Sequence, residues 1–225
     1  MIDKPVGWTS FDVVAKVRGM LRQQLKAEGT KLKVKVGHTG TLDPLATGLL
    51  VLLIGNYTKR AEEYTKSDKT YEVTMKLGET STTGDEEGEK TQVSTHQPTK
   101  AELQAAFEQF SGEIMQTPPQ FSAIKVDGQR AYKLARAGKE VKLEPRQVTV
   151  YRLELTDYKY PSVQFTTEVS SGTYIRSLVK DIGKELSTDA YMTALRRTKV
   201  GRFNIQNAID PTKINIEHIQ ANISI

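Results

Sequence analysis

Apolar residues recur at helical spacing in several stretches of the chain. Valine and leucine side chains between residues 11 and 25 fall on one face of a predicted amphipathic helix, which Thr9 or Ser10 can cap. A Thr-Lys-Ala-Glu capping box predicts a second helix over residues 99–112. The pattern also predicts helices over 58–64 and 130–139, after Thr173, and within 189–203.

Other stretches have the patterns of β-strands. Residues 71–77 alternate apolar and polar side chains, as a half-buried strand does, and residues 148–158 and 163–169 predict two long strands. The continuous apolar run 49–54 predicts one strand buried on both faces. The polar, acidic residues 80–95 predict an exposed loop. Strands and helices without a regular βαβ rhythm indicate an α+β fold on a large mixed sheet.

Composition narrows the class of protein. The 225 residues are 37% hydrophobic and 26% charged, which is ordinary for a globular protein. A net charge of +5 favours an anionic partner, either nucleic acid or an anionic membrane surface. There is no cysteine, and the three histidines are scattered, so we expect no disulfide and no metal site. Without a signal peptide or a membrane-spanning apolar run, a cytoplasmic protein without membrane association is expected.

One stretch, residues 37–48, combines three glycines and three threonines with a single carboxylate, Asp43. Glycine permits close approach of a ligand, and Pro44 directs Asp43 toward an extended conformation. On composition alone, a turn capped by Asp43 is as good an interpretation as a ligand-binding loop. A phosphate-binding loop is excluded because no Gly-Lys-Ser/Thr follows the glycines. The aspartyl-phosphate motif Asp-Lys-Thr-Gly-Thr is excluded because Gly37 occupies the position of its aspartate.

The string GHTGTLDPLATGLL, residues 37–50, resembles the signature of the TruB family of tRNA pseudouridine synthases. Residues 4–10, Lys-Pro-Val-Gly-Trp-Thr-Ser, resemble the opening motif of that family, and residues 172–178, Gly-Thr-Tyr-Ile-Arg-Ser-Leu, resemble its late arginine motif. Together the resemblance covers about residues 2–204. It implies the pseudouridine synthase fold, in which a large mixed, mostly antiparallel sheet is flanked by helices and loops.

The resemblance also implies roles for single residues. Asp43 is the expected nucleophile, Tyr71 lies against the target base, and Arg176 forms an ion pair with Asp43. Without the resemblance, Tyr71 is a core aromatic and Arg176 a surface arginine in the first turn of a helix, where the helix dipole disfavours a cation. Three further residues are expected to bind the substrate, and Asp85 is a second candidate near the site. The three are His38, which braces the gap left by the base, Leu195, which walls the base pocket, and Tyr174.

The expected activity is isomerisation of uridine 55 in the T arm of tRNA, without metal or organic cofactor. The alternative is an RNA-binding module or tRNA folding chaperone with little catalysis. His38 and Leu45-Ala46 resemble the bacterial branch, so no guide RNA is expected as a partner, and the protein is expected to be a monomer. Residues 1–204 are predicted to form the catalytic domain and 205–225 a C-terminal tail or linker, with no RNA-binding PUA domain visible. The basic helix within 130–139 is expected to border the RNA groove.

Overall fold

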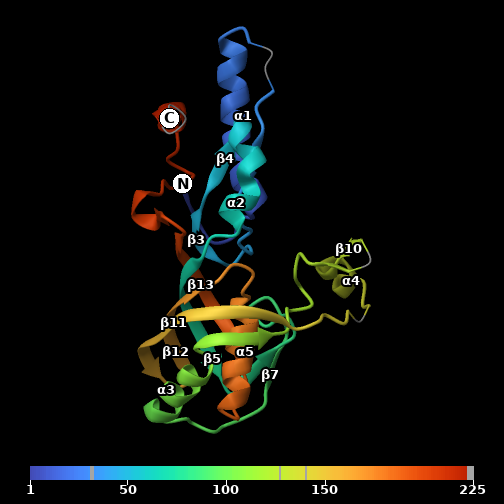
Figure 1. Ribbon diagram of the computed structural model, residues 1–225, viewed down its shortest axis with the longest axis vertical. Coiled ribbons are helices and arrows are strands. Elements are labelled where there is room, and N and C mark those ends of the chain that lie inside the picture. The colour runs from blue at the N-terminus through green and yellow to red at the C-terminus, as the bar shows by residue number, and fades with distance from the viewer. Residues whose placement is uncertain (31–32, 127, 140, 222–225) are drawn as a thin grey trace. The chain divides into compact units, whose positions relative to one another are not determined.

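The computed structural model describes residues 1–30, 33–126, 128–139 and 141–221 (Figure 1). An eight-stranded sheet with the order β1-β3-β13-β5-β12-β11-β8 organises the chain, and β14 pairs with β13. Strand β13 is parallel to β3, whereas β1–β3, β11–β12, β8–β11 and β13–β14 are antiparallel. The predicted α+β fold on a large, mixed and mostly antiparallel sheet is confirmed.

Two compact units make up the chain, and strands β5 (Lys69–Leu77) and β13 (Ala190–Val200) contribute residues to both. Unit 1 consists of Met1–Tyr71 and Leu195–Ile225, and unit 2 of Glu72–Ala194. The remaining elements of unit 1 are β1 (Ile2–Lys4), α1 (Ser10–Ala27), β2 (Val36–His38), β3 (Thr47–Leu50), β4 (Leu52–Ile54), η1 (Gly55–Arg60), α2 (Ala61–Thr65), β14 (Phe203–Asn204), η2 (Ile205–Asn207) and α6 (Ile216–Ala221).

The elements of unit 2 are a set of hairpins and helices around the long strands. They are β6 (Glu79–Ser81), β7 (Lys90–Gln92), α3 (Lys100–Gln109), β8 (Gly112–Gln116), β9 (Lys125–Val126), β10 (Gln129–Arg130), α4 (Ala131–Arg136), β11 (Arg146–Lys159), β12 (Ser162–Val169) and α5 (Ile175–Glu185). Helix α3 packs against β11 and α5. The Phe107 ring meets Phe165 edge-on, with ring centroids 5.3 Å apart, so this helix is anchored to β12 by an aromatic pair.

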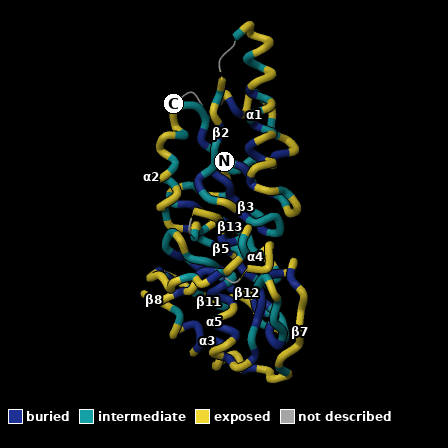
Figure 2. The backbone as a smooth tube through the Cα atoms, turned by 90° about the vertical axis from the view of Figure 1, so that its right-hand side faces the viewer, coloured by how far each residue is buried: buried dark blue, intermediate teal, exposed yellow. Residues whose placement is uncertain are grey.

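Helix α1 shows how the predicted pattern becomes packing. Thr9 caps it, and Asp12 bonds back to the Thr9 amide, which completes a capping box. Its buried valines and leucine pack against β2 and Ile219 of α6, while the opposite side is exposed (Figure 2). Residues 205–221 therefore belong to the packed structure of unit 1: Ile209 pairs with Ile2, and Ile219 is 4% exposed. No helix in the described part of the chain has the length and apolar character needed to cross a membrane.

Two predicted elements were wrong in type or extent. The apolar run 49–54 is two strands, because the chain leaves the large sheet at Val51, whose carbonyl accepts the Thr39 amide at 3.1 Å. Strand β3 then pairs with β1, and β4 pairs with β2 in a separate two-stranded sheet. No helix forms within 189–203, because Ala190–Val200 is the strand β13, fixed by pairing with β3 on one side and β5 on the other. Sheet pairing here overrides local propensity.

Two other predictions need smaller corrections. The acidic stretch 80–95 is not a plain loop, since Glu79–Ser81 and Lys90–Gln92 form an antiparallel hairpin. Residues 58–64 contain a 3-10 helix followed by a short α-helix. The α-helix follows Arg60 and has no side-chain cap, and the Thr58 hydroxyl donates to the Gly55 carbonyl. The pair Asp127-Gly128 is typical of a turn, but Asp127 lies outside the described residues.

Gly48 allows the parallel contact between β3 and β13. It lies opposite Arg197 with φ +102°, and a Cβ atom there would be 2.3 Å from the Arg197 carbonyl oxygen and 2.7 Å from its amide nitrogen. Both obstacles are backbone atoms of a central strand, so they cannot move aside as a flexible side chain would. The loop that carries Asp43 therefore ends at a position that only glycine fits.

We expect Gly48→Ala to lower the free energy of unfolding by about 3 kcal/mol, from steric overlap together with the cost of positive φ. Gly29→Ala is the matched control, because Gly29 also has a positive φ, +72°, but nothing lies within 4 Å of its added Cβ. The control should lose only about 1 kcal/mol. Urea denaturation of both variants measures the difference, and equal losses would contradict the steric explanation.

Candidate functional site

Asp43 lies in the loop between β2 and β3 of unit 1, and its side chain is half-buried. The neighbouring backbone is fixed on both sides. Ser10, at the start of α1, accepts the Leu42 amide at 2.8 Å and donates to the Leu42 carbonyl at 3.1 Å. On the other side, the Pro44 carbonyl accepts the Gly7 amide at 2.9 Å. The carboxylate is therefore presented by a backbone that the N-terminal motif holds in place.

Lys4 is the strongest of these anchors. Its side chain is fully buried, and its Nζ donates to the carbonyls of Trp8, Pro5 and Pro44 at 2.6, 2.9 and 3.2 Å. Burial lowers the pKa of Lys4 to about 8, while the charge of Asp43 acts in the opposite direction. The ammonium thus joins the 4–8 segment to the residue after Asp43 and adds a positive charge to the field around the carboxylate.

Arg197 of β13 holds both ends of the loop. It is 2% exposed, and its guanidinium donates from Nε to the Leu49 carbonyl at 2.8 Å and from Nη2 to the Gly40 carbonyl at 3.0 Å. Both bonds satisfy loop or strand carbonyls with a charged donor, which strengthens them relative to neutral pairs. Lys4 and Arg197 together fix the loop from residue 40 to residue 49.

His38 ends β2 and faces the same loop. Its Nδ1 accepts the Gly40 amide at 3.3 Å, which requires that this nitrogen carry no proton. Burial lowers the pKa of His38, and the nearby Arg197 charge lowers it further. Both observations favour a neutral imidazole at pH 7 with its proton on Nε2. The nitrogen that remains for a ligand is thus a hydrogen-bond donor.

Tyr71 and Leu195 complete the predicted residues of unit 1. Tyr71 is the third residue of β5 and 7% exposed, and its hydroxyl makes no hydrogen bond to the residues that the structure describes. Leu195, in β13, is half-buried, and its carbonyl accepts the Thr47 hydroxyl at 3.4 Å. Unit 1 therefore contains four of the six predicted site residues, namely His38, Asp43, Tyr71 and Leu195.

Arg176 lies in unit 2, in the first turn of α5 as predicted. Its guanidinium donates to the Phe121 carbonyl at 2.8 Å and the Thr83 carbonyl at 3.2 Å, and lies 3.4 Å from an oxygen of Asp85. The Arg176 and Asp85 side chains are 10% and 9% exposed, so this ion pair is largely removed from water. The Asp85 charge compensates a cation that the helix dipole disfavours at this position.

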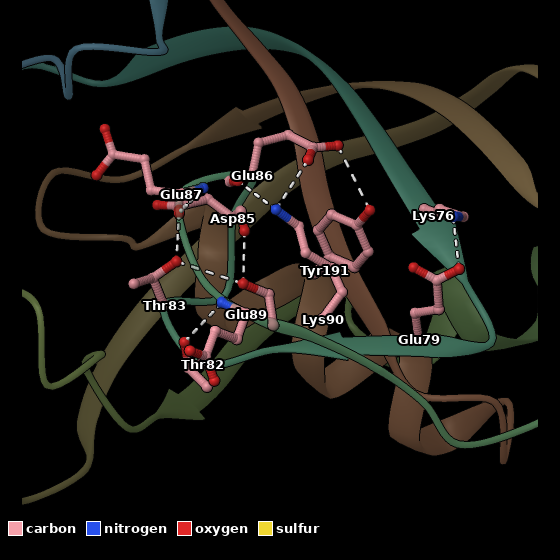
Figure 3. A network of polar contacts seen from close by, with 11 residues as sticks. Lys76, Glu79, Thr82, Thr83, Asp85, Glu86, Glu87, Glu89, Lys90 and Tyr191 are labelled. Atoms are coloured by element: carbon pink, nitrogen blue, oxygen red, sulfur yellow. Dashed lines mark hydrogen bonds and ion pairs between the residues drawn. The ribbon is translucent and has the colours of Figure 1, made fainter.

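Asp85 is itself positioned by the β6–β7 hairpin (Figure 3). Its Oδ1 accepts the Thr83 hydroxyl at 2.5 Å and the Glu87 amide at 3.1 Å. The neighbouring Glu86 pairs with Lys90 at 3.1 Å and accepts the Tyr191 hydroxyl at 3.4 Å. Glu86 is thus neutralised by Lys90, and Asp85 is a buried structural carboxylate next to Arg176.

Tyr174 precedes α5 and is held by its backbone. Gln116, 2% exposed, accepts the Tyr174 amide at 2.8 Å and donates to its carbonyl at 3.1 Å. A cavity of about 610 Å³ lies beside this turn of α5, between the 80–84 and 117–121 segments and the Ser177 face of the helix. Within its lining, burial raises the pKa of Asp181, and the charges of Lys184 and Lys180 oppose that shift. Among the described residues, no group of three or more histidine or acidic side chains is arranged to hold a metal ion.

The chain matches two family models. The model described as "TruB family pseudouridylate synthase (N terminal domain)" matches residues 22–175. The model described as "tRNA pseudouridylate synthase B C-terminal domain" matches residues 176–222. The chain belongs to the TruB family of pseudouridylate synthases. It is 43% identical to a protein named tRNA pseudouridine synthase B from Pseudomonas fluorescens, over 98% of the chain and 69% of that relative. A protein of the same name from Bacteroides fragilis is 43% identical, over 94% of the chain and 89% of that relative.

Solved structures of this family's fold are also similar. The chain resembles a component of a Cbf5-Nop10-Gar1 complex with a TM-score of 0.67 and 30% identity, over 90% of the chain and 48% of that protein. It resembles a component of an H/ACA RNP bound to a substrate RNA containing 2′-deoxyuridine with a TM-score of 0.65 and 26% identity, over 100% of the chain and 54% of that protein. The chain spans about half the length of these two proteins. The expected pseudouridine synthase fold is confirmed.

Sequence reasoning missed three supporting residues, Lys4, Gln116 and Arg197. Lys4 and Arg197 lie in stretches that the motifs covered, but a lysine or arginine in a sequence is ordinarily exposed. Gln116 carried no signal, because a glutamine pairs with a backbone amide and carbonyl only through the tertiary fold. The predicted ion pair between Asp43 and Arg176 joins residues of different units and stays a prediction.

We expect Lys4→Met to lower the free energy of unfolding by about 3 kcal/mol, because the carbonyls of Pro5, Trp8 and Pro44 would lose a charged donor inside the protein. The exposed Lys59→Met serves as the control and should change stability by less than about 0.5 kcal/mol. Because folding depresses the pKa of Lys4 to about 8, the parent should gain stability relative to Lys4→Met as pH rises from about 8 toward 10.5. Urea denaturation across this window measures both effects, and a Lys4→Met variant as stable as the parent would refute the anchoring role.

Proposed function

We propose that this protein isomerises uridine to pseudouridine in the T arm of tRNA, at position 55, with Asp43 as the nucleophile. The observation that carries the proposal is the placement of Asp43, in a chain of the TruB family, on a loop fixed by the buried Lys4 and Arg197. Relatives of the same family, 43% identical, are named tRNA pseudouridine synthase B. The T-arm position and the aspartate mechanism rest on the motif resemblance.

The reaction breaks the C1′–N1 glycosidic bond and joins C1′ to C5 of the same base. The proton on C5 is released and N1, which carries no proton in uridine, takes one up, so there is no net oxidation and no second substrate. Asp43 acts either by adding to C6 of the pyrimidine or by assisting departure at the ribose carbon. In both routes the carboxylate must be ionised to act as a nucleophile.

The other site residues then have consistent roles. Tyr71 holds the base and relays a proton through a hydroxyl that the described fold leaves unused. The base must leave its stack to be reached, and His38 braces the vacated place as a neutral donor. Leu195 and Tyr174 line the base. Arg176, oriented by Asp85, pairs with Asp43 and sets the direction of its carboxylate.

We expect Asp43→Asn to abolish pseudouridine formation while leaving tRNA affinity within about tenfold, because the amide keeps the shape of the loop but is not a nucleophile. The assay contains only protein, tRNA and excess EDTA, so conversion by the parent also tests the proposal that neither guide RNA nor metal is needed. Pseudouridine is mapped at position 55. Parental turnover by Asp43→Asn would remove Asp43 from the mechanism, and parental RNA binding without conversion would favour an RNA-binding or chaperone function.

We expect Arg176→Lys to lower kcat by about 100-fold with tRNA affinity within about threefold, since lysine keeps the charge but loses the planar fork that holds two carbonyls and a carboxylate. Arg152→Lys is the matched control, because Arg152 also pairs with an acidic residue, Glu154, but is 61% exposed. It should behave like the parent in single-turnover kinetics. If Arg176→Lys weakens only RNA binding, Arg176 is a phosphate contact and not a positioning residue.

A further inference from the structure

The positive charge of the protein is concentrated in unit 1. Unit 1 contains 17 lysines and arginines against 9 aspartates and glutamates, whereas unit 2 contains 15 against 18. The net charge of +5 is therefore the sum of a positive charge on unit 1 and a smaller negative charge on unit 2. An anionic ligand is attracted chiefly to surfaces of unit 1.

Helix α1 carries much of this charge on its exposed side. Phe11, Arg18, Arg22 and Lys26 follow one another at spacings of seven, four and four residues, so they form one stripe along the helix. Between residues 13 and 27 the helix has no acidic residue. Arg18 is anchored within the stripe, since its guanidinium lies 5.7 Å from the centre of the Phe11 ring and donates to the Val36 carbonyl at 3.2 Å.

The segment before β2 extends the same surface. Val34 and Val36 pack into the core beneath α1, so the alternating Lys33 and Lys35 point outward and are exposed. The Arg18 bond to Val36 places this segment along the border of the stripe. We call the four exposed side chains Arg22, Lys26, Lys33 and Lys35 the basic ridge.

The basic ridge differs from the exposed cations that have an acidic partner nearby in the chain. Lys66–Glu62, Arg60–Glu63 and Arg152–Glu154 are such pairs, with the acid two to four residues away. None of the ridge side chains pairs with a carboxylate among the residues that the structure describes. Glu28, the acid at the end of α1, accepts instead from Gln24 at 2.6 Å. The ridge therefore presents four uncompensated positive charges.

We propose that the basic ridge binds the phosphate backbone of the same tRNA at a place remote from the reacting uridine. The inference rests on the proposed function. Ser10 bonds directly to the loop of Asp43, and Lys26 lies 16 residues further along α1, or about 24 Å at 1.5 Å per residue. Lysine and arginine side chains on a helix surface suit contacts to phosphates, which carry the negative charge of the RNA but do not distinguish one base from another. A lipid surface fits less well, because the apolar face of α1 is already buried against α6 and β2.

The test compares full-length tRNA with an isolated T-arm hairpin. The ridge variant is Arg22→Gln/Lys26→Gln/Lys33→Gln/Lys35→Gln, since glutamine keeps helix propensity and removes charge. The matched control removes four other exposed lysines, Lys59, Lys100, Lys159 and Lys213. A rescue variant, Arg22→Lys/Lys26→Arg/Lys33→Arg/Lys35→Arg, keeps every charge. Affinity for both RNAs is measured by fluorescence anisotropy at several salt concentrations, together with pseudouridine formation and thermal unfolding.

The ridge variant should bind full-length tRNA at least tenfold more weakly at 0.1 M salt, and the slope of log K against log salt should become shallower by about three. Its affinity for the hairpin and its turnover on the hairpin should stay within about twofold of the parent, as should the rescue variant on both RNAs. An unchanged salt slope, an equal loss in the control variant, or an equal loss on the hairpin overturns the proposal. A parent that converts uridine in neither RNA refutes the proposed function, while the binding comparison still decides whether the ridge holds RNA.

Discussion

The hydrogen bonds from the buried Lys4 ammonium to three backbone carbonyls are the interaction on which the Asp43 loop depends. Leu42 and Ala46 of this loop are buried, but its glycines have no side chain to pack, so the backbone around them is held by hydrogen bonds. A charged donor does this strongly, because unpaired carbonyls inside a protein are costly and a cation satisfies several at once. The charge of Asp43 acts on this ammonium in turn, because it opposes the lowering of the Lys4 pKa by burial. Lys4 therefore both holds the loop and interacts electrostatically with its carboxylate.

Arginine repeats this solution twice. Arg197 holds carbonyls at both ends of the loop in unit 1, and Arg176 holds two carbonyls and Asp85 in unit 2. In each case a planar cation is fixed by its own unit before any ligand arrives. A site whose charges are already oriented loses little free energy to reorganisation when charge develops in a reaction. The buried charges therefore contribute to the proposed catalysis through their placement, and the surrounding carbonyls offset their desolvation.

Local patterns predicted most of the elements, and tertiary pairing decided the rest. The Thr9 cap, the helical face of α1 and the alternation of β5 are properties of short stretches, so the sequence predicts them directly. The break at Val51 and the strand at Ala190–Val200 depend on partners far away in the chain, which local periodicity does not encode. The motifs predicted Asp43 and Arg176 as site residues, and their placement matches a loop and a helix start. The supporting residues Lys4, Gln116 and Arg197 donate to or accept from backbone atoms of other segments. The residue type alone does not reveal such contacts.

The packing of α6 against α1 has a consequence for experiments on fragments of this protein. Ile219 and its neighbours cover the apolar side of α1, and Ile209 extends the pairing of the first strand. A fragment that ends at residue 204 would lose Ile214, Ile216 and Ile219, which help to bury Val17 and Leu21. The apolar surface exposed in this way would favour aggregation. A loss of activity in such a fragment would therefore not show whether residues 205–225 take part in RNA recognition. Any contribution of these residues to RNA binding has to be measured with point substitutions that preserve the packing of α6 against α1.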